Sequence, residues 1–273
     1  DSVIAANNGK ISGSIDNGLS YVFGRNSNSN LTIFIDNFNS KDLFPEFSIF
    51  SVKGPIELMF LPLGKDNNTY IRSDINLTNA NVYIPSLALK KMKGTFGELK
   101  FDFTKDNKSS FEYLQNDVLV SGNAIHESNF EVNKVNYSSI KTPDIRIRRA
   151  TFQKFGDYNQ FKTNKGTITL DFLMSLSFKK KKTPLDIIFS DILVTSDGNI
   201  VLDSIKGEIR SFQGLRGYAK AELSSNSNLE VIISPHEDNG INLVFSGNNA
   251  GELLRRGDYY RNGYGGMFKA SIF

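Results

Sequence analysis

The sequence predicts an all-β fold built mostly from antiparallel strands. Apolar residues recur at every second position through most of the chain, and turn-forming Asn-Gly and Asp-Gly dipeptides punctuate it. Helical periodicity is scarce. Because successive side chains of a strand point to opposite faces, each run has one apolar and one mostly polar face. That pattern is typical of antiparallel sheets, since strands of buried parallel sheets read as continuous apolar runs.

Length and composition narrow the class of protein. The 273 residues are enough for one large or two ordinary domains. No break in composition marks a linker, so we expect a single continuous β segment over residues 1–273. A net charge of +3 argues against a nucleic-acid partner. The absence of cysteine excludes disulfides and thiolate metal sites.

Within each predicted strand, the apolar residues recur at every second position. In each run the apolar positions alternate with mostly polar ones, so the apolar side chains are expected on one face of the sheet. These positions are Ile33, Ile35, Ile56, Leu58, Phe60, Leu99, Phe101, Phe103, Ile168, Leu170, Phe172, Leu229, Val231 and Ile233. Residues 145–148 show the same alternation.

Two segments are candidates for short helices. Residues 249–256 place Ala250, Leu253 and Leu254 on one helical face, with Asn248 or Asn249 as the cap. We expect both leucines to pack on the sheet and the two arginines that follow to point outward. Residues 85–92 could form another helical turn. A weak repeat also relates residues 53–60 to residues 93–101, at a period of about forty residues.

No constellation of residues points to catalysis, a cofactor or a metal. The only histidines, His126 and His236, lie in polar, turn-like contexts and are expected in surface loops. The glycines near residue 265 precede a strand, whereas a phosphate-binding loop precedes a helix. We therefore predict a non-enzymatic protein with no catalytic residue, no metal and no cofactor.

The C-terminal stretch, residues 241–273, resembles a pattern of the AsmA-like proteins of Gram-negative envelopes, especially the YhdP-type members. It reads as a strand, a short helix, a Gly-rich turn and a strand. Residues 74–85 and the Lys91-x-x-Gly94-x-x-Gly97 turn are also similar to that family, and the resemblance covers roughly residues 44–273. Asn249 stands where the family usually has Asp. The matching positions are Ala250, Gly251, Leu253, Leu254, Arg255, Gly265 and Gly266.

This resemblance implies an elongated, twisted sheet with a U-shaped cross-section. Its apolar face would be a groove for phospholipid acyl chains, lined by the alternating positions given above. A structural role would then fall to Asn249, Ala250, Gly251, Leu253, Leu254, Gly265 and Gly266. The implied function is phospholipid transport between the inner and outer membranes.

The same resemblance implies a location and a context for the chain. It would lie in the periplasm as a piece of a longer protein, anchored to the inner membrane by a segment outside this chain. Two alternatives remain open: an envelope-assembly scaffold like the TamB proteins of outer-membrane biogenesis, and a closed β-sandwich binding module, for example one for polysaccharide.

Overall fold

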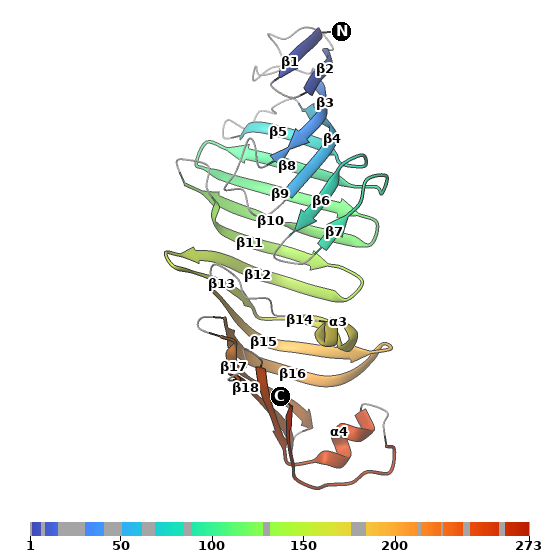
Figure 1. Cartoon of the computed structure of the whole chain (residues 1–273), viewed down its shortest axis with the longest axis vertical. Helices are drawn as coiled ribbons and strands as arrows, with labels where there is room; N and C mark the ends of the chain where they lie inside the picture. Colours follow the sequence, from blue (N-terminus) through green and yellow to red (C-terminus); the bar gives the residue numbers. More distant parts are fainter. Residues whose placement is uncertain are drawn as a thin grey trace. The chain divides into compact units, whose positions relative to one another are not determined.

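The computed structural model describes residues 2–6, 9–15, 31–40, 51–61, 69–84, 89–127, 132–175, 184–211, 214–224, 226–236, 241–256 and 260–272. The described residues form β-strands with the short helices α3 (Leu170–Ser175) and α4 (Ala250–Arg256) (Figure 1). All but two of the strand pairings defined by register are antiparallel. The predicted all-β, mostly antiparallel fold is therefore confirmed.

The chain divides into two compact units, Asp1–Ser138 (unit 1) and Ser139–Phe273 (unit 2). The boundary falls within β11 (Val132–Lys141). The expectation of one continuous segment with a U-shaped cross-section stays a prediction, and each unit is described by itself below.

Unit 1 is an antiparallel sheet in which two neighbouring stretches of chain each form two short strands separated by a few residues. Strands β1 to β4 pair in chain order; β4 then pairs with β6 over its first half and with β5 over its second. β7 pairs with β6, while β8 pairs with β5 and with β9, which pairs with β10. The strands are β1 (Ser2–Ala6), β2 (Gly9–Ile15), β3 (Leu31–Asn39), β4 (Ser51–Phe60), β5 (Thr69–Asn76), β6 (Asn81–Ile84), β7 (Leu89–Lys91), β8 (Glu98–Thr104), β9 (Lys108–Gln115) and β10 (Val118–His126).

The two interruptions of unit 1, residues 77–80 and residues 92–97, face each other and share one buried lysine. Lys91 Nζ donates to the carbonyl oxygens of Leu77 at 2.6 Å and Ala80 at 2.8 Å, and to those of Thr78 and Met92 at 3.2 and 3.3 Å. The Lys91 side chain is 2% exposed. Burial lowers its pKa, because desolvation disfavours the ammonium, and the four carbonyl oxygens offset that cost.

The glycines of the Lys91-x-x-Gly94-x-x-Gly97 turn have separate structural reasons. Gly94 has a φ of +86°, which favours glycine, and its N–H donates to Thr78 O at 2.8 Å. A Cβ on Gly97 would stand 2.4 Å from Lys91 Cε, so only glycine leaves room for the buried lysine stem. The turn is thus built around Lys91.

The weak sequence repeat corresponds to a symmetric arrangement around β5. Glu57 and Glu98 both pair with Asn76, and Leu58 and Leu99 both pair with Ile75. Each copy also carries a glycine of positive φ, Gly54 (+126°) and Gly94 (+86°). The two similar segments therefore place similar side chains on the two sides of one strand.

Unit 2 is a second sheet, antiparallel except at β15. β12 pairs with β13 and β14; these run parallel to β15, and β15 to β20 follow in antiparallel order. Parallel neighbours require a crossover connection, and α3 lies within it. The strands are β12 (Ile145–Phe155), β13 (Tyr158–Thr163), β14 (Gly166–Thr169), β15 (Leu185–Ser196), β16 (Asn199–Arg210), β17 (Arg216–Ser224), β18 (Ser227–Pro235), β19 (Ile241–Gly247) and β20 (Phe268–Ile272).

Bulges cross neighbouring strands of unit 2 at one level. Arg149, Asp191 and Ser204 have φ values of 66°, 51° and 46°, which is uncommon for residues other than glycine. Asp191 and Ser204 lie where the pairing register shifts, and Arg149 lies where β12 changes partner from β14 to β13. A bulge bends its strand and increases its twist. Because these irregularities lie at one level of β12, β15 and β16, we expect the sheet to bend along the line that joins them. β15 and β16 are visibly curved (Figure 1).

One predicted turn is confirmed and two predicted elements are wrong. Asp197 (φ 48°) and Gly198 (φ 82°) form the two-residue hairpin between β15 and β16. Leu170 and Phe172 lie in helix α3 rather than in a strand, because Thr169 Oγ1 accepts the N–H of Phe172 at 3.2 Å and caps a helix there. The predicted helical turn over residues 85–92 is wrong at Leu89–Lys91, which pair with β6; residues 85–88 lie outside the described part.

Candidate functional site

The pairing register places the predicted apolar positions of unit 1 on one face. Directly opposed residues of neighbouring strands share a face. Ile35 pairs with Ile56, and longer rows cross several strands. One row runs Ile33, Leu58, Ile75, Leu99, Tyr113, Val120, and the next runs Phe60, Ser73, Phe101, Phe111, Gly122. Phe103 belongs to the same face, two residues beyond Phe101.

Burial of that face increases from β3 towards β10. Ile33, Leu58 and Phe101 are half-buried, whereas Tyr113 is 1% exposed and Val120 is fully buried. Burial raises the pKa of the Tyr113 phenol, whose hydroxyl donates to Gln115 Oε1 at 2.8 Å. The face is therefore partly exposed over β3 and at some positions of β4, β5 and β8, where Ile56, Ser73 and Leu99 are nevertheless buried.

Unit 2 presents an equally continuous apolar face. Three rows cross it, each contributed by consecutive strands. They are Phe152, Phe161, Ile187, Ile209, Gly217, Ile233, Leu243; then Ala150, Thr163, Phe189, Gly207, Ala219, Val231, Phe245, Ala270; then Ile147, Gly166, Ile192, Ile205. Ile168 and Leu229 lie on this face too, opposite Val194 and Ala221.

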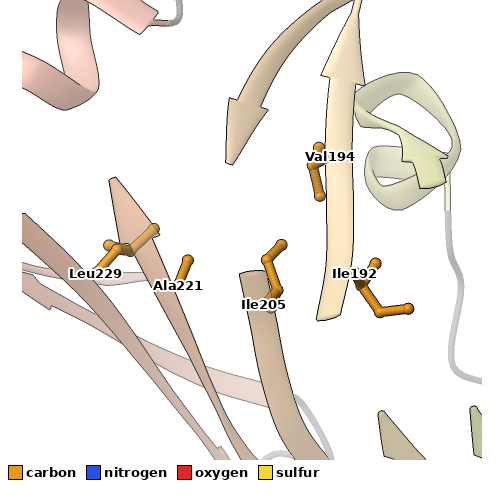
Figure 2. Close-up of a cluster of buried hydrophobic side chains, with 5 residues drawn as sticks. All are labelled: Ile192, Val194, Ile205, Ala221 and Leu229. Atoms are coloured by element: carbon orange, nitrogen blue, oxygen red, sulfur yellow. The ribbon is translucent and has the colours of Figure 1, made fainter. Parts of the chain in front are cut away.

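One end of the unit 2 face is covered. Ile192, Val194, Ile205, Ala221 and Leu229 form a buried cluster on four successive strands (Figure 2). Leu170 of α3 and Leu253 of α4 pack against it, as does Phe268 of β20. We call the part of the apolar face that these side chains occupy the covered end.

On the other side of the bulges, the row that runs from Phe152 to Leu243 is less buried. Phe161, Ile187, Ile209, Ile233 and Leu243 are all half-buried. Within the described residues of unit 2 no second sheet packs on them, and the covering helices contact the covered end. We call this row the uncovered end.

On this face, aromatic rings lie over glycines of the neighbouring strands. A Cβ on Gly207 would meet Phe189 Cζ at 2.8 Å, and one on Gly247 would meet Phe268 Cε1 at 2.5 Å. A ring over a glycine of the neighbouring strand also replaces packing that the missing side chain would have supplied. The apolar surface is therefore continuous across these glycines.

The opposite face of unit 2 carries a polar row. Lys206, Lys220, Glu230, Ser246 and Lys269 form one row across five strands. Lys220 Nζ lies 3.0 Å from Glu230 Oε1, an exposed ion pair of small energetic worth. This face therefore carries charge, although its next row also exposes Tyr218 and Ile232.

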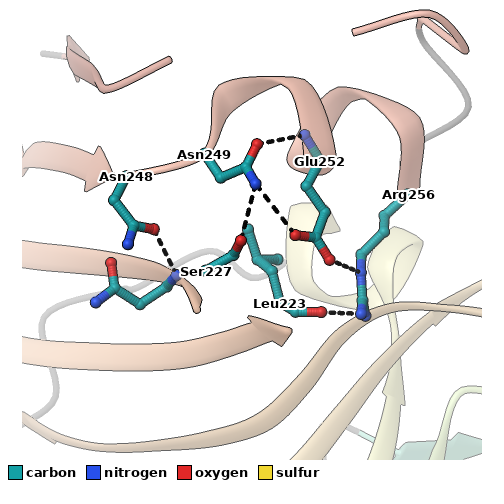
Figure 3. Close-up of polar contacts among 7 residues, drawn as sticks. Leu223, Ser227, Asn248, Asn249, Glu252 and Arg256 are labelled. Carbon is teal, nitrogen blue, oxygen red and sulfur yellow. Dashed lines mark hydrogen bonds and ion pairs between the residues drawn. The ribbon is translucent and has the colours of Figure 1, made fainter. Parts of the chain in front are cut away.

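Helix α4 is held to the sheet by its cap. Asn249 Oδ1 accepts the N–H of Glu252 at 3.0 Å, and Asn249 Nδ2 donates to Ser227 Oγ at 2.9 Å (Figure 3). Asn249 Nδ2 also contacts Glu252 Oε2 at 3.4 Å. An aspartate here could cap the helix, but it would lack the amide donor and would face the Glu252 carboxylate. This explains physically why asparagine suits the position in this chain.

The Gly-rich turn packs against the first residues of α4. Ala250 N–H donates to Gly266 O at 2.7 Å, and Gly251 N–H donates to Gly265 O at 3.0 Å. A Cβ on Gly251 would stand 2.3 Å from Tyr264 N, so this contact requires glycine. The predicted helix is confirmed as Ala250–Arg256, with Asn249 as its cap.

Two details of the predicted α4 packing are wrong. Leu253 packs on the covered end as expected, but Leu254 is 41% exposed. Arg256 turns inward, where its Nε lies 3.3 Å from Glu252 Oε1 and its guanidinium donates to Leu223 O. The reason is the i, i+4 spacing of Glu252 and Arg256, which places both on the face that meets β17.

The expectation that His126 is a surface-loop residue is wrong. It ends β10 with 6% exposure, and its Nε2 lies 2.7 Å from Ser109 Oγ, which is itself buried. The Phe103 ring packs edge-on against the imidazole, with 5.5 Å between the two ring centroids. His126 follows the two-residue phase of Val120 and Ala124, a signal in the sequence that could have placed it on the inner face.

Other kinds of site find no support in the described ranges. No group of three His, Cys, Asp or Glu side chains there could hold a metal ion. Neither of α3 and α4 has the length and apolar character needed to span a bilayer. The candidate site is therefore the apolar face itself.

Comparison with known proteins adds no assignment, since no family model, curated protein or solved structure matches the chain.

Proposed function

We propose that the apolar faces of the two units bind phospholipid acyl chains, and that the protein carries phospholipids between the inner and outer membranes without catalysing a reaction. The observation that carries the proposal is the uncovered end of unit 2. Its Phe, Ile and Leu side chains are half-buried, with no second sheet packed on them in the described part of unit 2.

An open apolar face of this kind needs an occupant. Large exposed hydrocarbon surfaces are aggregation liabilities in water and usually mark a binding surface. A closed sandwich would instead bury both inner faces against each other. The half-buried state of Ile187, Ile209 and Ile233 favours the open groove over that alternative.

The chemistry of the face suits acyl chains better than a polar ligand. Each methylene moved from water to an apolar surface contributes about 0.8 kcal/mol, and this energy is non-directional. A lipid could therefore move along rows of similar side chains without passing a single deep minimum. Headgroups would remain in water at the edge of the face.

The context of this function follows the family resemblance of residues 44–273. We place the protein in the periplasm, anchored to the inner membrane through a segment outside this chain. A role as an envelope-assembly scaffold remains the alternative, and it predicts no lipid on the apolar face.

Paired crosslinking positions test the proposal within one strand. A photoreactive benzoyl-phenylalanine at position 233, on the inner face, should crosslink to phospholipid in cells. The same residue at position 232 should not, because Ile232 is 47% exposed on the opposite face. Lipid adducts would be detected by radiolabelled phosphate after purification. Equal crosslinking at both positions, or none at 233, would refute acyl binding on this face.

A further inference from the structure

We propose that α4 and residues 260–267 form a docking tip that inserts into the interface of a bilayer containing anionic phospholipid. The docking tip exposes large apolar side chains at an unusual density. Leu254 is 41% exposed, Tyr260 58%, Tyr264 81% and Met267 88%. Contiguous exposed apolar side chains on a folded protein mark an interaction surface.

Backbone contacts hold the segment that carries Tyr260 and Tyr264 against α4, which carries Leu254. Tyr260 N–H donates to Leu254 O at 3.2 Å, and Gly263 N–H donates to Tyr260 O at 3.4 Å. A Cβ on Gly251 would stand 2.4 Å from Gly263 C, so Gly251 has no room for a side chain, and a Cβ on Gly263 would lie 3.0 Å from Gly251 Cα. The apolar groups are therefore displayed by a packed turn, so that little ordering is required when they meet a partner.

The charges around the docking tip are those that suit an anionic membrane. Arg255, Arg261 and Lys269 are exposed, and the Arg255 guanidinium lies 5.3 Å from the centre of the Tyr264 ring. The nearby acid Glu252 is paired with Arg256. Residues 139–273 hold 19 Lys and Arg against 14 Asp and Glu, whereas residues 1–138 hold 13 against 15. Basic side chains attract anionic headgroups, and tyrosine rings settle at the level of the headgroups.

The same element reaches the covered end of the apolar face. Leu253 packs on the covered end of the apolar face, while the next residue, Leu254, is exposed on the docking tip. Phe268 of the covered end follows Met267 directly. As an entry point for acyl chains the docking tip rests on the proposed function, but its binding to a bilayer can be measured separately.

Vesicle co-sedimentation tests the docking tip. The protein should pellet with vesicles of three parts phosphatidylcholine to one part phosphatidylglycerol, and less with phosphatidylcholine alone or in high salt. The triple variant L254S, Y264S, M267S should bind the anionic vesicles at least about tenfold more weakly, since three apolar insertions are lost. The matched control Y218S, I232S removes two side chains of 46% and 47% exposure from the face opposite the apolar rows and should bind like the wild type.

Two results would overturn the docking tip. One is a triple variant that keeps wild-type circular dichroism and wild-type vesicle binding. The other is a wild-type protein that binds neither vesicle, which would leave this surface to a protein partner. Crosslinking of detergent-dispersed phospholipid at position 233 separates this inference from the proposed function. If that crosslink is absent while vesicle binding depends on the three residues, the groove fails and the docking tip stands.

Discussion

Replacing Lys91 with methionine should lower the free energy of unfolding of unit 1 by about 2–4 kcal/mol. The change keeps an unbranched side chain, one heavy atom shorter than that of lysine, and removes the ammonium donors. The carbonyl oxygens of Leu77 and Ala80, which accept from Lys91 Nζ at 2.6 and 2.8 Å, would lose their ammonium donor in an environment where both residues are almost fully buried. Urea unfolding followed by far-UV circular dichroism measures the loss.

The neighbouring lysine supplies a matched control. Lys90 is exposed, and its ammonium lies 5.9 Å from the Tyr83 ring centre. K90M should change the free energy of unfolding by less than about 1 kcal/mol. Equal effects of K91M and K90M would show that the hydrogen bonds from Lys91 Nζ to the four carbonyl oxygens do not stabilise residues 77–80 and 92–97.

An aspartate on the apolar face of unit 2 should have opposite consequences at its two ends. V194D places a carboxyl group where the native side chain is 1% exposed beneath α3, so it should destabilise the unit by about 4 kcal/mol or more. I233D lies at the uncovered end, where water can reach the carboxylate. The I233D variant should keep the wild-type circular dichroism spectrum. It should bind at least about tenfold less lipid than the wild type, because a charge would then lie in the acyl path.

The comparison needs a third variant and has a clear contrary result. I232D, on the opposite face of the same strand, should keep both fold and lipid. If I233D unfolds the unit as V194D does, the uncovered end is in fact a closed core, and the sandwich alternative gains. Thermal melts and lipid extraction from the purified variants report the two properties independently.

Much of the fold can be predicted from alternation alone. A two-residue phase determines which side chains share a face, so the inner rows of β3, β4, β8 and β18 follow from the sequence. The Asp197-Gly198 turn follows from its dipeptide, because both positions need a positive φ. What alternation cannot show is whether a face is covered, since a groove and a sandwich share the same pattern.

The failures have local causes. Leu170 and Phe172 continue an alternating run, but the Thr169 cap outweighs it and starts α3. The cage of Lys91 depends on two interruptions brought together by strand pairing, so a lysine in a polar stretch gives no sign of its burial. The inward turn of Arg256 likewise depends on the Leu223 carbonyl of a strand distant in sequence.

Mass spectrometry of the lipids that co-purify with this chain tests the central claim most directly. The protein would be purified from a Gram-negative host in mild detergent and extracted beside I233D and I232D. We expect phospholipid at or above one molecule per chain in the wild type and in I232D, and a loss of at least about tenfold in I233D. Wild-type protein that is folded and free of phospholipid, or equal lipid in I233D, would contradict acyl binding on the apolar face.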